Sequence, residues 1–364
     1  MHKVLITGAG GGGGENLITS LRISSLDLAI FGSNMDKHLV AKTSADFPLL
    51  LPPASDPSYV DQLAKVIVTN KIDLVIPNND TEVGVISANR DALPCTIFLP
   101  PDDTIRKCHD KLKMHECFLE VGIPQATYRG LEQWDDIEHF MVEYPAERYW
   151  IRPRRGSGSR GATWVNNAEQ ARSWIKLWCE LQNFTLTDFI ISEFLPGRDY
   201  AFQSVWKDGR MVVGKMIERL QYFFGRNMLS GMSSSPSIAR TLLDMETFEN
   251  VILKAIHGIC ETPHGNFNLD LKGCDGGTMC VTEFNIGRFC MITPIFDQTG
   301  KYNTAEMHVR SALDLDVEVH DSLDYEDGCY LIRELDTLPT ILRADEFENK
   351  VNSLAKSLNT GMTI

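Results

Sequence analysis

The sequence predicts a mixed fold in which an α/β domain with a parallel sheet precedes an α+β region. Short apolar strands alternate with helices through residues 1–99, which is the rhythm of a parallel sheet covered by helices. Further along, apolar strands follow one another across short glycine turns, which is typical of antiparallel hairpins. At 364 residues, 43% of them hydrophobic, the chain is long enough for two or three lobes with a proper core.

The first unit of the chain is a strand, a glycine turn and a helix. Lys3–Gly8 reads as a buried parallel strand, residues 9–14 as the turn, and Glu15–Ile23 as the helix. The turn formally satisfies the G-x-G-x-x-G fingerprint, but Ser33, and no acidic residue, follows the second strand Leu28–Gly32. The sequence therefore disfavours NAD binding. The glycines serve either as a tight turn or as a site for another anion, such as a substrate carboxylate, at the helix N-terminus.

The alternation of strands and helices continues to the end of this domain. Ser58–Asn70 is an amphipathic helix and Ile72–Pro77 is a strand. Asp80 and Glu82 follow at the carboxyl end of that strand, where open α/β sheets bind ligands. They are candidates to contact a substrate, and capping of the next helix is the alternative. Cys95–Leu99 is the last strand, and a domain boundary is expected near residue 103.

A basic glycine loop dominates the next region. A charged helix over Thr104–Val121 carries Lys111, and a strand ending at Arg152 leads into a loop of glycines, serines and arginines that ends at Gly161. Such a loop can press its backbone N–H groups against phosphates, and Arg152 can direct a fixed charge at the same anion. A flexible, solvated turn is the alternative reading. Ala162–Val165 returns as a short strand.

Two hairpins are expected next, covered by helices as a small α+β lid. Asp188–Leu195 is a strand that carries Glu193, and Arg198–Trp206 is its expected hairpin partner. A turn at Asp208 leads into a further strand, Arg210–Glu218. The region 221–236 reads as a loop near a site, with disorder as the alternative. The remaining expected elements are a helix (Glu246–Cys260), a hairpin (Gly265–Lys272 with Met279–Phe284), a strand (Cys329–Arg333) and a last helix (Phe347–Leu358).

Polar side chains on the later hairpin indicate a cation site. Asp270 lies on its first strand, and Glu283 alternates with Asn285 on the second, so that these two share a face. Two carboxylates and one amide that converge on one point supply the oxygen ligands that Mg²⁺ requires, together with phosphate oxygens and water. Asp270 taken alone reads as a surface aspartate.

Composition limits the class of partner and the compartment. A net charge of -14 argues against non-specific binding to nucleic acid or to an anionic membrane. No run approaches the roughly 20 apolar residues of a transmembrane helix, and the N-terminus does not read as a signal peptide. Without a C-x-x-C pair, the cysteines read as reduced thiols of a cytoplasmic protein. They are Cys95, Cys108, Cys117, Cys179, Cys260, Cys274, Cys280, Cys290 and Cys329.

Four segments in this order resemble the ATP-grasp superfamily, in particular the stand-alone proteins similar to one half of the carbamoyl-phosphate synthase large subunit. They are Ile151–Gly161, Glu193–Asp199, Asn268–Asp270 and Glu283–Arg288. The resemblance covers roughly residues 1–310. It implies a Rossmann-like, pre-ATP-grasp parallel-sheet domain at 1–103 and a two-lobed ATP-grasp module at 104–310. The lid of that module would span about 148–216, and residues 311–364 would form a C-terminal extension packed on the core.

The resemblance also implies roles for matching residues. Lys111 and Arg152 would hold the α- and β-phosphates of ATP, and Asp199 would accept from the ribose hydroxyls, where relatives usually have glutamate. Arg288 would face the transferring phosphoryl group, although it stands one residue later than in relatives. The other implied positions are the phosphate loop (Gly156, Ser157, Gly158, Ser159, Gly161), the adenine site (Glu193, Phe194, Leu195) and the ligands of one or two Mg²⁺ ions (Asp270, Glu283, Asn285). Asp270 replaces the usual Glu or Gln.

The activity implied by the resemblance is that of an ATP-dependent carboxylate–amine ligase working through an acyl phosphate. Arg219, with Arg226 in the loop through Ser235, is the candidate to bind the substrate carboxylate. The partners would be a small carboxylic acid and an amine, Mn²⁺ can stand in for Mg²⁺, and family habit suggests a homodimer. Two alternatives remain. One is a carbamate or carboxylate kinase that releases the acyl phosphate, and the other is a non-catalytic ATP-binding regulator.

Overall fold

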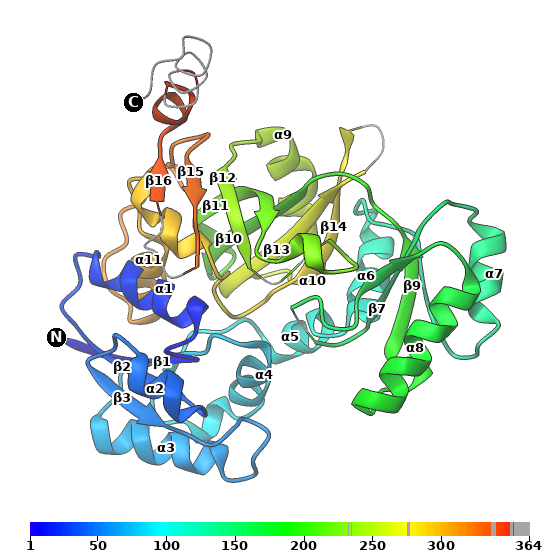
Figure 1. Cartoon of the computed structure of the whole chain (residues 1–364). Helices are drawn as coiled ribbons and strands as arrows, with labels where there is room; N and C mark the ends of the chain where they lie inside the picture. The colour runs from blue at the N-terminus through cyan, green and yellow to red at the C-terminus, as the bar shows by residue number, and fades with distance from the viewer. Residues whose placement is uncertain are drawn as a thin grey trace.

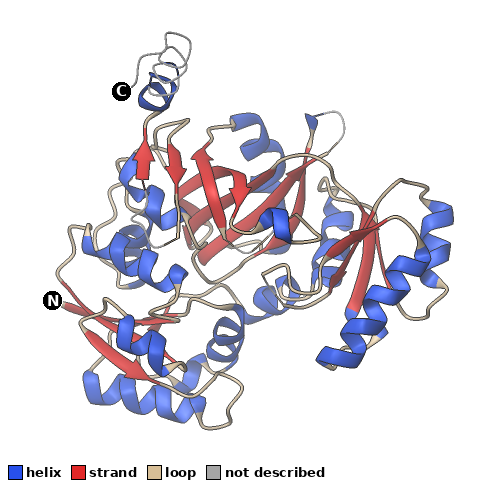
Figure 2. Ribbon diagram, in the orientation of Figure 1, coloured by secondary structure: helices blue, strands red, loops and turns tan. Residues whose placement is uncertain are grey.

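The computed structural model describes residues 1–349 apart from 157, 232, 234, 275–276 and 336–339, together with residue 352. This part of the chain forms a parallel sheet of five strands and two antiparallel sheets of four and seven strands. Figure 1 shows the parallel sheet at the lower left in blue, the four-stranded sheet at the right, and the seven-stranded sheet above and between them. The mixed α/β and α+β fold class expected from the sequence is confirmed (Figure 2).

The parallel sheet has the strand order β3-β2-β1-β4-β5. Side chains alternate between its faces, so Val4 and Ile6 share a core cluster with Leu17, whereas Leu5 shares another with Leu63. Helices therefore cover both faces. The elements of this lobe are β1 (His2–Thr7), α1 (Gly12–Arg22), β2 (Leu28–Asn34), α2 (Lys37–Lys42), β3 (Phe47–Leu50), α3 (Tyr59–Asn70), β4 (Leu74–Ile76), α4 (Asp80–Ala88), η1 (Arg90–Ala92), β5 (Thr96–Ile97) and α5 (Asp102–Cys108).

The four-stranded sheet has the order β6-β9-β7-β8. Ile151 and Ile191 on its buried face pack with Phe140 and Ile175 of the two helices that cover it. We call this small layer, residues 128–193, the lid. Its elements are β6 (Tyr128–Gly130), α7 (Asp136–Glu143), β7 (Tyr149–Pro153), β8 (Thr163–Val165), α8 (Ala168–Gln182), η2 (Leu186–Asp188) and β9 (Phe189–Glu193).

The seven-stranded sheet has the order β14-β13-β10-β11-β12-β15-β16. One face packs Phe267 against Phe118 and Ile256, and the other packs Val205 against Val309. Its strands are β10 (Asp199–Lys207), β11 (Arg210–Tyr222), β12 (Pro236–Thr241), β13 (Gly265–Gly273), β14 (Met279–Phe284), β15 (Tyr330–Ile332) and β16 (Thr340–Leu342). The helices around it are α6 (Lys111–Val121), η3 (Gly225–Asn227), α9 (Met245–Thr247), η4 (Phe248–Ile252), α10 (Leu253–Ile259), η6 (Thr293–Thr299) and α11 (Thr304–Ala312).

Three expected elements differ in the structure. The strand β9 pairs with β6 and β7, while β10 pairs with β11 and β13, so the expected hairpin between β9 and β10 is wrong. The single helix expected over Thr104–Val121 is two helices, because Asp110 is the N-cap of α6 and accepts from the backbone N–H of Leu112. The helix expected over Glu246–Cys260 passes through a π-helical segment at η4.

Other expectations hold or stay untested. The hairpin of β13 and β14 and the strand β15 are confirmed. The last expected helix lies mostly outside the described residues. The expected division into 1–103, 104–310 and 311–364 stays a prediction. So do the bounds of about 148–216 that the sequence suggested for a lid, which differ from the layer given that name here. No helix in the described part of the chain has the length and apolar character needed to cross a bilayer.

One pair of cysteines departs from the expectation of reduced thiols. Cys274 and Cys280 are joined by a disulfide at the end of the β13–β14 hairpin, while the other seven cysteines are free. Hairpin pairing brings the two Cα atoms to 6.3 Å although they are six positions apart in the sequence. No spacing rule for metal or redox motifs covers such a pair.

A buried polar cluster joins the N-terminal lobe to the large sheet. The hydroxyl of Ser20, on α1, donates to Oδ2 of Asp297 at 2.6 Å. Oδ1 of the same carboxylate pairs with Nζ of Lys215 at 3.1 Å and accepts from the hydroxyl of Thr304 at 2.6 Å. Burial lowers the pKa of Lys215, and the Asp297 carboxylate opposes that shift. Three separate segments thus meet at one carboxylate.

Candidate active site

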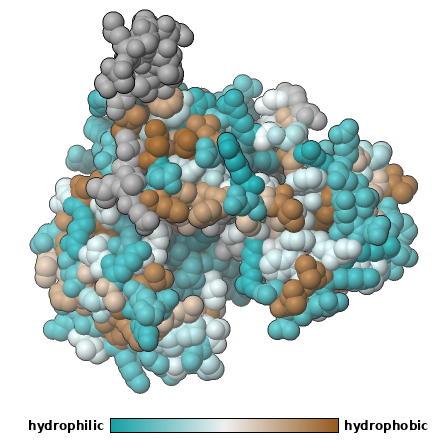
Figure 3. Space-filling view, in the orientation of Figure 1, coloured by the Kyte–Doolittle hydropathy of each residue, from teal (hydrophilic) through white to brown (hydrophobic). Residues whose placement is uncertain are grey.

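A cavity of about 530 Å³ opens where the three sheets approach one another, which is a usual size for a small-molecule site. Asp80 lines it from the N-terminal lobe, Arg152 from the lid, and Asp270 and Glu283 from the large sheet. Figure 3 shows the surface hollowed between the N-terminal lobe and the lid. Three parts of the chain therefore contribute to one site.

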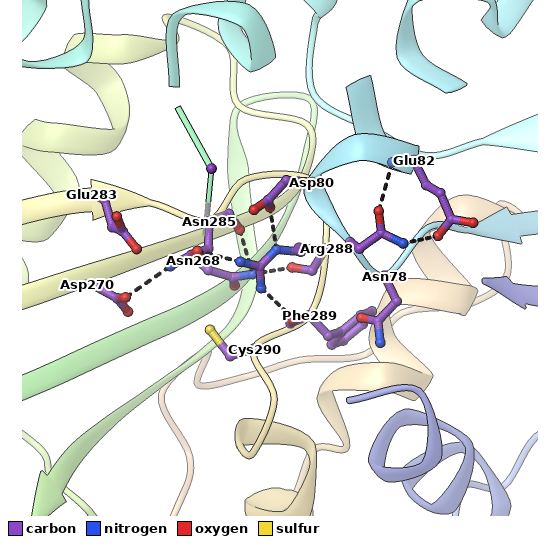
Figure 4. Close-up of polar contacts among 12 residues, drawn as sticks. Asn78, Asp80, Glu82, Asn268, Asp270, Glu283, Asn285, Arg288, Phe289 and Cys290 are labelled. Carbon is purple, nitrogen blue, oxygen red and sulfur yellow. Dashed lines mark hydrogen bonds and ion pairs between the residues drawn. The ribbon is translucent and has the colours of Figure 1, made fainter. Parts of the chain in front are cut away.

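The hairpin of β13 and β14 presents two carboxylates to this cavity. Asp270 and Glu283 are direct partners in the antiparallel register. Asn285 donates its amide to Oδ2 of Asp270 at 3.1 Å (Figure 4). Arg219 pairs with Oδ1 of Asp270 at 2.6 Å. Among the described residues no group of three or more His, Cys, Asp or Glu side chains could hold a metal ion. A Mg²⁺ site here would combine two carboxylates and an amide with phosphate oxygens and water, a donor set that this cation accepts.

Two basic side chains converge on Glu283. Nζ of Lys111 lies 3.4 Å from Oε2 of Glu283, and Nη1 of Arg152 lies 3.7 Å from the same oxygen. Lys111 also donates to the backbone carbonyl of Gly156 at 2.7 Å, and Arg152 donates to that of Thr282 at 3.0 Å. Both side chains are largely buried, so their charges act at short range and with little screening. This part of the cavity, formed by Lys111, Arg152 and Glu283, is suited to an anion that binds together with a metal cation.

His115 orients Arg152, and sequence reasoning missed it. Nδ1 of His115 pairs with Oε1 of Gln125 at 2.6 Å, so Nε2 is left to accept from Nη2 of Arg152 at 2.9 Å. Burial, with the nearby Arg152 charge, lowers the pKa of His115 to about 3. The ring is therefore neutral and can accept from the guanidinium. Its position four residues after Lys111 on a helix was the available signal, because such residues share a face.

The glycine loop is tied to the start of α6. Arg154 pairs with Asp110 at 2.9 Å, and Arg155 approaches the same carboxylate at 3.4 Å. Gly156 and Gly158 line the cavity at φ values of +102° and +72°, which favour glycine.

The remaining predicted positions of this loop differ from one another. Ser159 also lines the cavity, at φ +56°. Gly161 packs behind the loop, where a Cβ atom would come within 2.9 Å of Pro153. Ser157 lies outside the described residues.

The far end of the cavity lies between the lid and the large sheet. Glu193, Phe194 and Leu195 line it, and Glu193 accepts from the backbone N–H of Thr127 at 3.2 Å. Asp199 lines it too and pairs with Lys272 at 2.8 Å. Apolar walls that the sequence did not mark complete this end, because in a sequence they look like ordinary core. They are Ala126, Trp150, Leu271 and Val281.

The opposite end of the cavity carries an ion pair between lobes. Nε of Arg288 lies 2.5 Å from Oδ1 of Asp80, and its Nη2 donates to Oδ1 of Asn285 at 2.5 Å (Figure 4). Gly287, at φ +76°, turns the chain just before Arg288. Asn268 donates its amide to the backbone carbonyls of Asn285 and Arg288 and so holds this turn.

The structure separates the two acidic candidates of the N-terminal lobe. Asp80 lines the cavity, whereas Glu82 accepts from the hydroxyls of Thr7 at 2.5 Å and Tyr59 at 3.0 Å. Burial raises the pKa of Glu82 against those hydrogen bonds. Glu82 therefore braces the lobe, and its neighbour Asn79 caps α4.

The glycine run is also packed. A Cβ atom at Gly10 would lie 2.0 Å from the carbonyl oxygen of Leu39, and the backbone N–H of Gly10 donates to Glu15 at 2.7 Å. Close approach of α2 therefore accounts for a glycine here.

Arg219 lies within β11 and lines the cavity, and β10 separates its strand from β13, the strand of Asp270. The loop that follows contributes Ser230, Gly231 and Ser233 to the lining. Arg226 is exposed in η3 and is not among the residues that line the cavity.

Solved structures share this fold. An L-amino acid ligase from Bacillus licheniformis matches with a TM-score of 0.68 and 13% identity over 91% of this chain and 79% of that one. An N5-carboxyaminoimidazole synthetase from Staphylococcus aureus, complexed with ADP, matches with 0.70 and 13% over 97% and 86%. The biotin carboxylase domain dimer of a Hydrogenobacter thermophilus 2-oxoglutarate carboxylase, with MgADP and bicarbonate, matches with 0.69 and 13% over 91% and 74%.

No protein-family model matches the chain, and no curated protein matches it in sequence. The structural likeness shows the fold, which is the ATP-grasp fold that the sequence motifs resemble.

Proposed function

We propose that this protein is an ATP- and Mg²⁺-dependent ligase that joins a carboxylic acid to an amine through an acyl phosphate. One observation carries the proposal. In a single cavity, the carboxylate pair Asp270 and Glu283 faces Lys111 and Arg152. Carboxylates that could hold cations next to buried cationic side chains fit a nucleotide phosphate chain with its metal, and they fit few other ligands.

The nucleotide would lie between the lid and the large sheet. Its base would contact the apolar walls and the backbone of the Glu193–Leu195 segment, and Asp199 would accept from the ribose hydroxyls. Lys111 and Arg152 would neutralise the phosphates, and the glycine loop through Gly158 and Ser159 would close over them. The ADP complex of the S. aureus synthetase supports ATP as the nucleotide.

Mg²⁺, held by Asp270, Glu283 and Asn285, would neutralise the charge that develops on the phosphates. The chain's own basic residues would do the rest. Arg219 would bind the substrate carboxylate, and Arg288 would stabilise the transferring phosphoryl group. A carboxylate oxygen attacks the γ-phosphorus and ADP leaves, and the amine then attacks the carbonyl carbon, releasing phosphate and a proton. The protein contributes chiefly position and charge.

Further details of the proposal have partial support. Mn²⁺ would replace Mg²⁺, since oxygen ligands suit both ions. A homodimer is proposed by analogy with the dimeric H. thermophilus domain. A cytoplasmic location is consistent with seven free cysteines among nine.

The test is release of ADP and phosphate from Mg-ATP, screened over pooled carboxylic acids with and without pooled amines. Release that requires both pools is the expected result. Release with acids alone, giving a product that hydroxylamine traps, would identify the acyl phosphate as the product and replace the ligase by a kinase. ATP binding without ADP release in any mixture would contradict the proposal and favour a regulator.

A further inference from the structure

Two guanidinium–carboxylate pairs line the cavity on the side where the substrate carboxylate is proposed to bind. Arg219 pairs with Asp270 at 2.6 Å, and Arg288 pairs with Asp80 at 2.5 Å. All four side chains are at most 25% exposed, so the cavity wall offers alternating charges of both signs with little solvent between them.

Each pair would open when the site fills, and each would open toward a different cation. In the proposed function Asp270 turns toward Mg²⁺, which leaves Arg219 available to a substrate carboxylate. Asp80 is the carboxylate of the second pair, and it belongs to the N-terminal lobe, at the first residue of α4, away from the β13–β14 hairpin. A second cation that faces Asp80 would leave Arg288 available in the same way. In a ligase site the natural second cation is an ammonium group.

We propose that Asp80 binds a substrate ammonium group, so that the acid activated by this protein is an α-amino acid. The proposal rests on the function proposed above. The Asp80 carboxylate and the Arg288 guanidinium stand side by side, as do the ammonium and carboxylate of an α-amino acid, with the signs reversed. The amino acid would place its ammonium on Asp80 and its carboxylate between Arg288 and Arg219.

The neighbouring wall indicates the kind of side chain. Cys290, Met291 and Ile292, which begin two positions after Arg288, also line the cavity. Cys290 is buried, and burial raises the pKa of its thiol to about 11, so it acts as a small apolar group. A small or medium apolar side chain fits this wall better than a charged one.

The experiment compares matched pairs of acids in the full-length protein. L-Alanine, L-valine and L-methionine are each compared with the same acid lacking the amino group, namely propionate, 3-methylbutanoate and 4-(methylthio)butanoate. ADP release is measured with Mg-ATP and with hydroxylamine as the acceptor amine. The expected result is a kcat/KM at least roughly 10-fold higher for an amino acid than for its partner, because a charge-assisted contact in a buried site is lost in the partner.

The variant Asp80→Asn separates ammonium binding from an effect through Arg288. We expect KM to rise roughly 10- to 100-fold for the amino acid and to change little for its partner, with KM for ATP unchanged. Asp91→Asn, an exposed change in the same lobe, is the control. Isothermal titration of L-methionine into the protein with MgADP gives a readout independent of turnover, and Asp80→Asn should weaken this binding by the same factor.

Three outcomes would overturn the inference. Equal rates for amino acids and their partners would remove it while leaving the ligase in place. An equal rise of both KM values in Asp80→Asn would make Asp80 only a positioning residue for Arg288. If none of these acids supports ADP release, and the screen over pooled acids and amines gives no release either, the proposed function on which the inference rests would be removed instead.

Discussion

Glu283 is the residue on which Lys111 and Arg152, the two basic residues proposed to bind phosphate, converge. Glu283→Gln keeps its shape but removes the charge that faces Lys111 and Arg152 and one of the two carboxylates proposed for Mg²⁺. We expect kcat to fall on the order of 100-fold and the Mg²⁺ concentration for half-maximal rate to rise. Steady-state ADP release over a Mg²⁺ titration measures both. Glu261→Gln, at an exposed position, should behave as wild type, and normal Mg²⁺ dependence in Glu283→Gln would contradict the metal assignment.

Two buried histidines make stability depend on pH. Burial lowers the pKa of His115 and of His308 to about 3, with contributions from Arg152 and His264 respectively. Since unfolded histidine titrates near 6.5, the unfolded chain binds more protons between the two values. The free energy of unfolding should therefore fall as pH drops from about 6 to about 4, by about 1.4 kcal/mol per pH unit for each histidine.

Urea unfolding at pH 7.5 and at pH 5 measures this effect. The change should shrink in His308→Gln, whose side chain does not titrate. An unfolding free energy equal at both pH values would show that these rings are not held neutral. Above pH 7 neither histidine contributes a pH dependence.

At the scale of elements, the start of α6 and the glycine loop depend on one aspartate. Asp110 caps α6 through the backbone N–H of Leu112 and also holds Arg154. Its pKa lies below the usual value because the Arg154 bonds outweigh its burial. Asp110→Asn keeps a good N-cap and loses the charge, whereas Asp110→Ala loses both.

We expect Asp110→Ala to cost about 3 to 5 kcal/mol of unfolding free energy, because it leaves Arg154 without its buried partner. Asp110→Asn should cost less, by about 1 kcal/mol for the retained cap. Both should raise the KM for ATP, since both release the loop from α6. Equal stabilities of the two variants would show that the cap contributes nothing, and an unchanged KM would show that the loop does not need this anchor.

Local sequence patterns predicted the position of single helices and strands better than they predicted which strands pair with one another. The alternation of Glu283 with Asn285 and the glycine turn before Met279 were enough to place the β13–β14 hairpin. The sequence did not predict the partners of β9, because an apolar strand fits the lid sheet and the large sheet equally well. One of those partners is β6, which lies far earlier in the chain. The break before Lys111 did have a local signal, an N-capping aspartate, that the charged helix pattern concealed.

At the scale of the molecule, the site exists only where three sheets meet. The sequence order of Lys111, Arg152, Asp270 and Glu283 anticipated residues that the structure gathers in one cavity. It could not give the pairing of Asp80 with Arg288, which are 208 positions apart. No periodicity or spacing records such a contact, since it arises only when separate lobes dock. Glu82 shows the converse, because its place two positions after Asp80 in the sequence says nothing of its burial against Tyr59.

The carboxylate of Asp297 accepts hydrogen bonds from Ser20 and Thr304 and forms an ion pair with Lys215. Because Ser20 lies on α1, the N-terminal lobe completes the interior around the large sheet. The chain therefore should not divide into independent modules. If it is cut after Pro101 and the fragments 1–101 and 102–364 are produced separately, we expect neither to fold stably alone. The larger fragment would expose the ion pair of Lys215 and Asp297 that the N-terminal lobe covers. Mixed together, they should associate and regain the activity of the whole chain. In Ser20→Ala that association, followed by sedimentation, should weaken, which would make this hydroxyl part of the contact that holds the two fragments together.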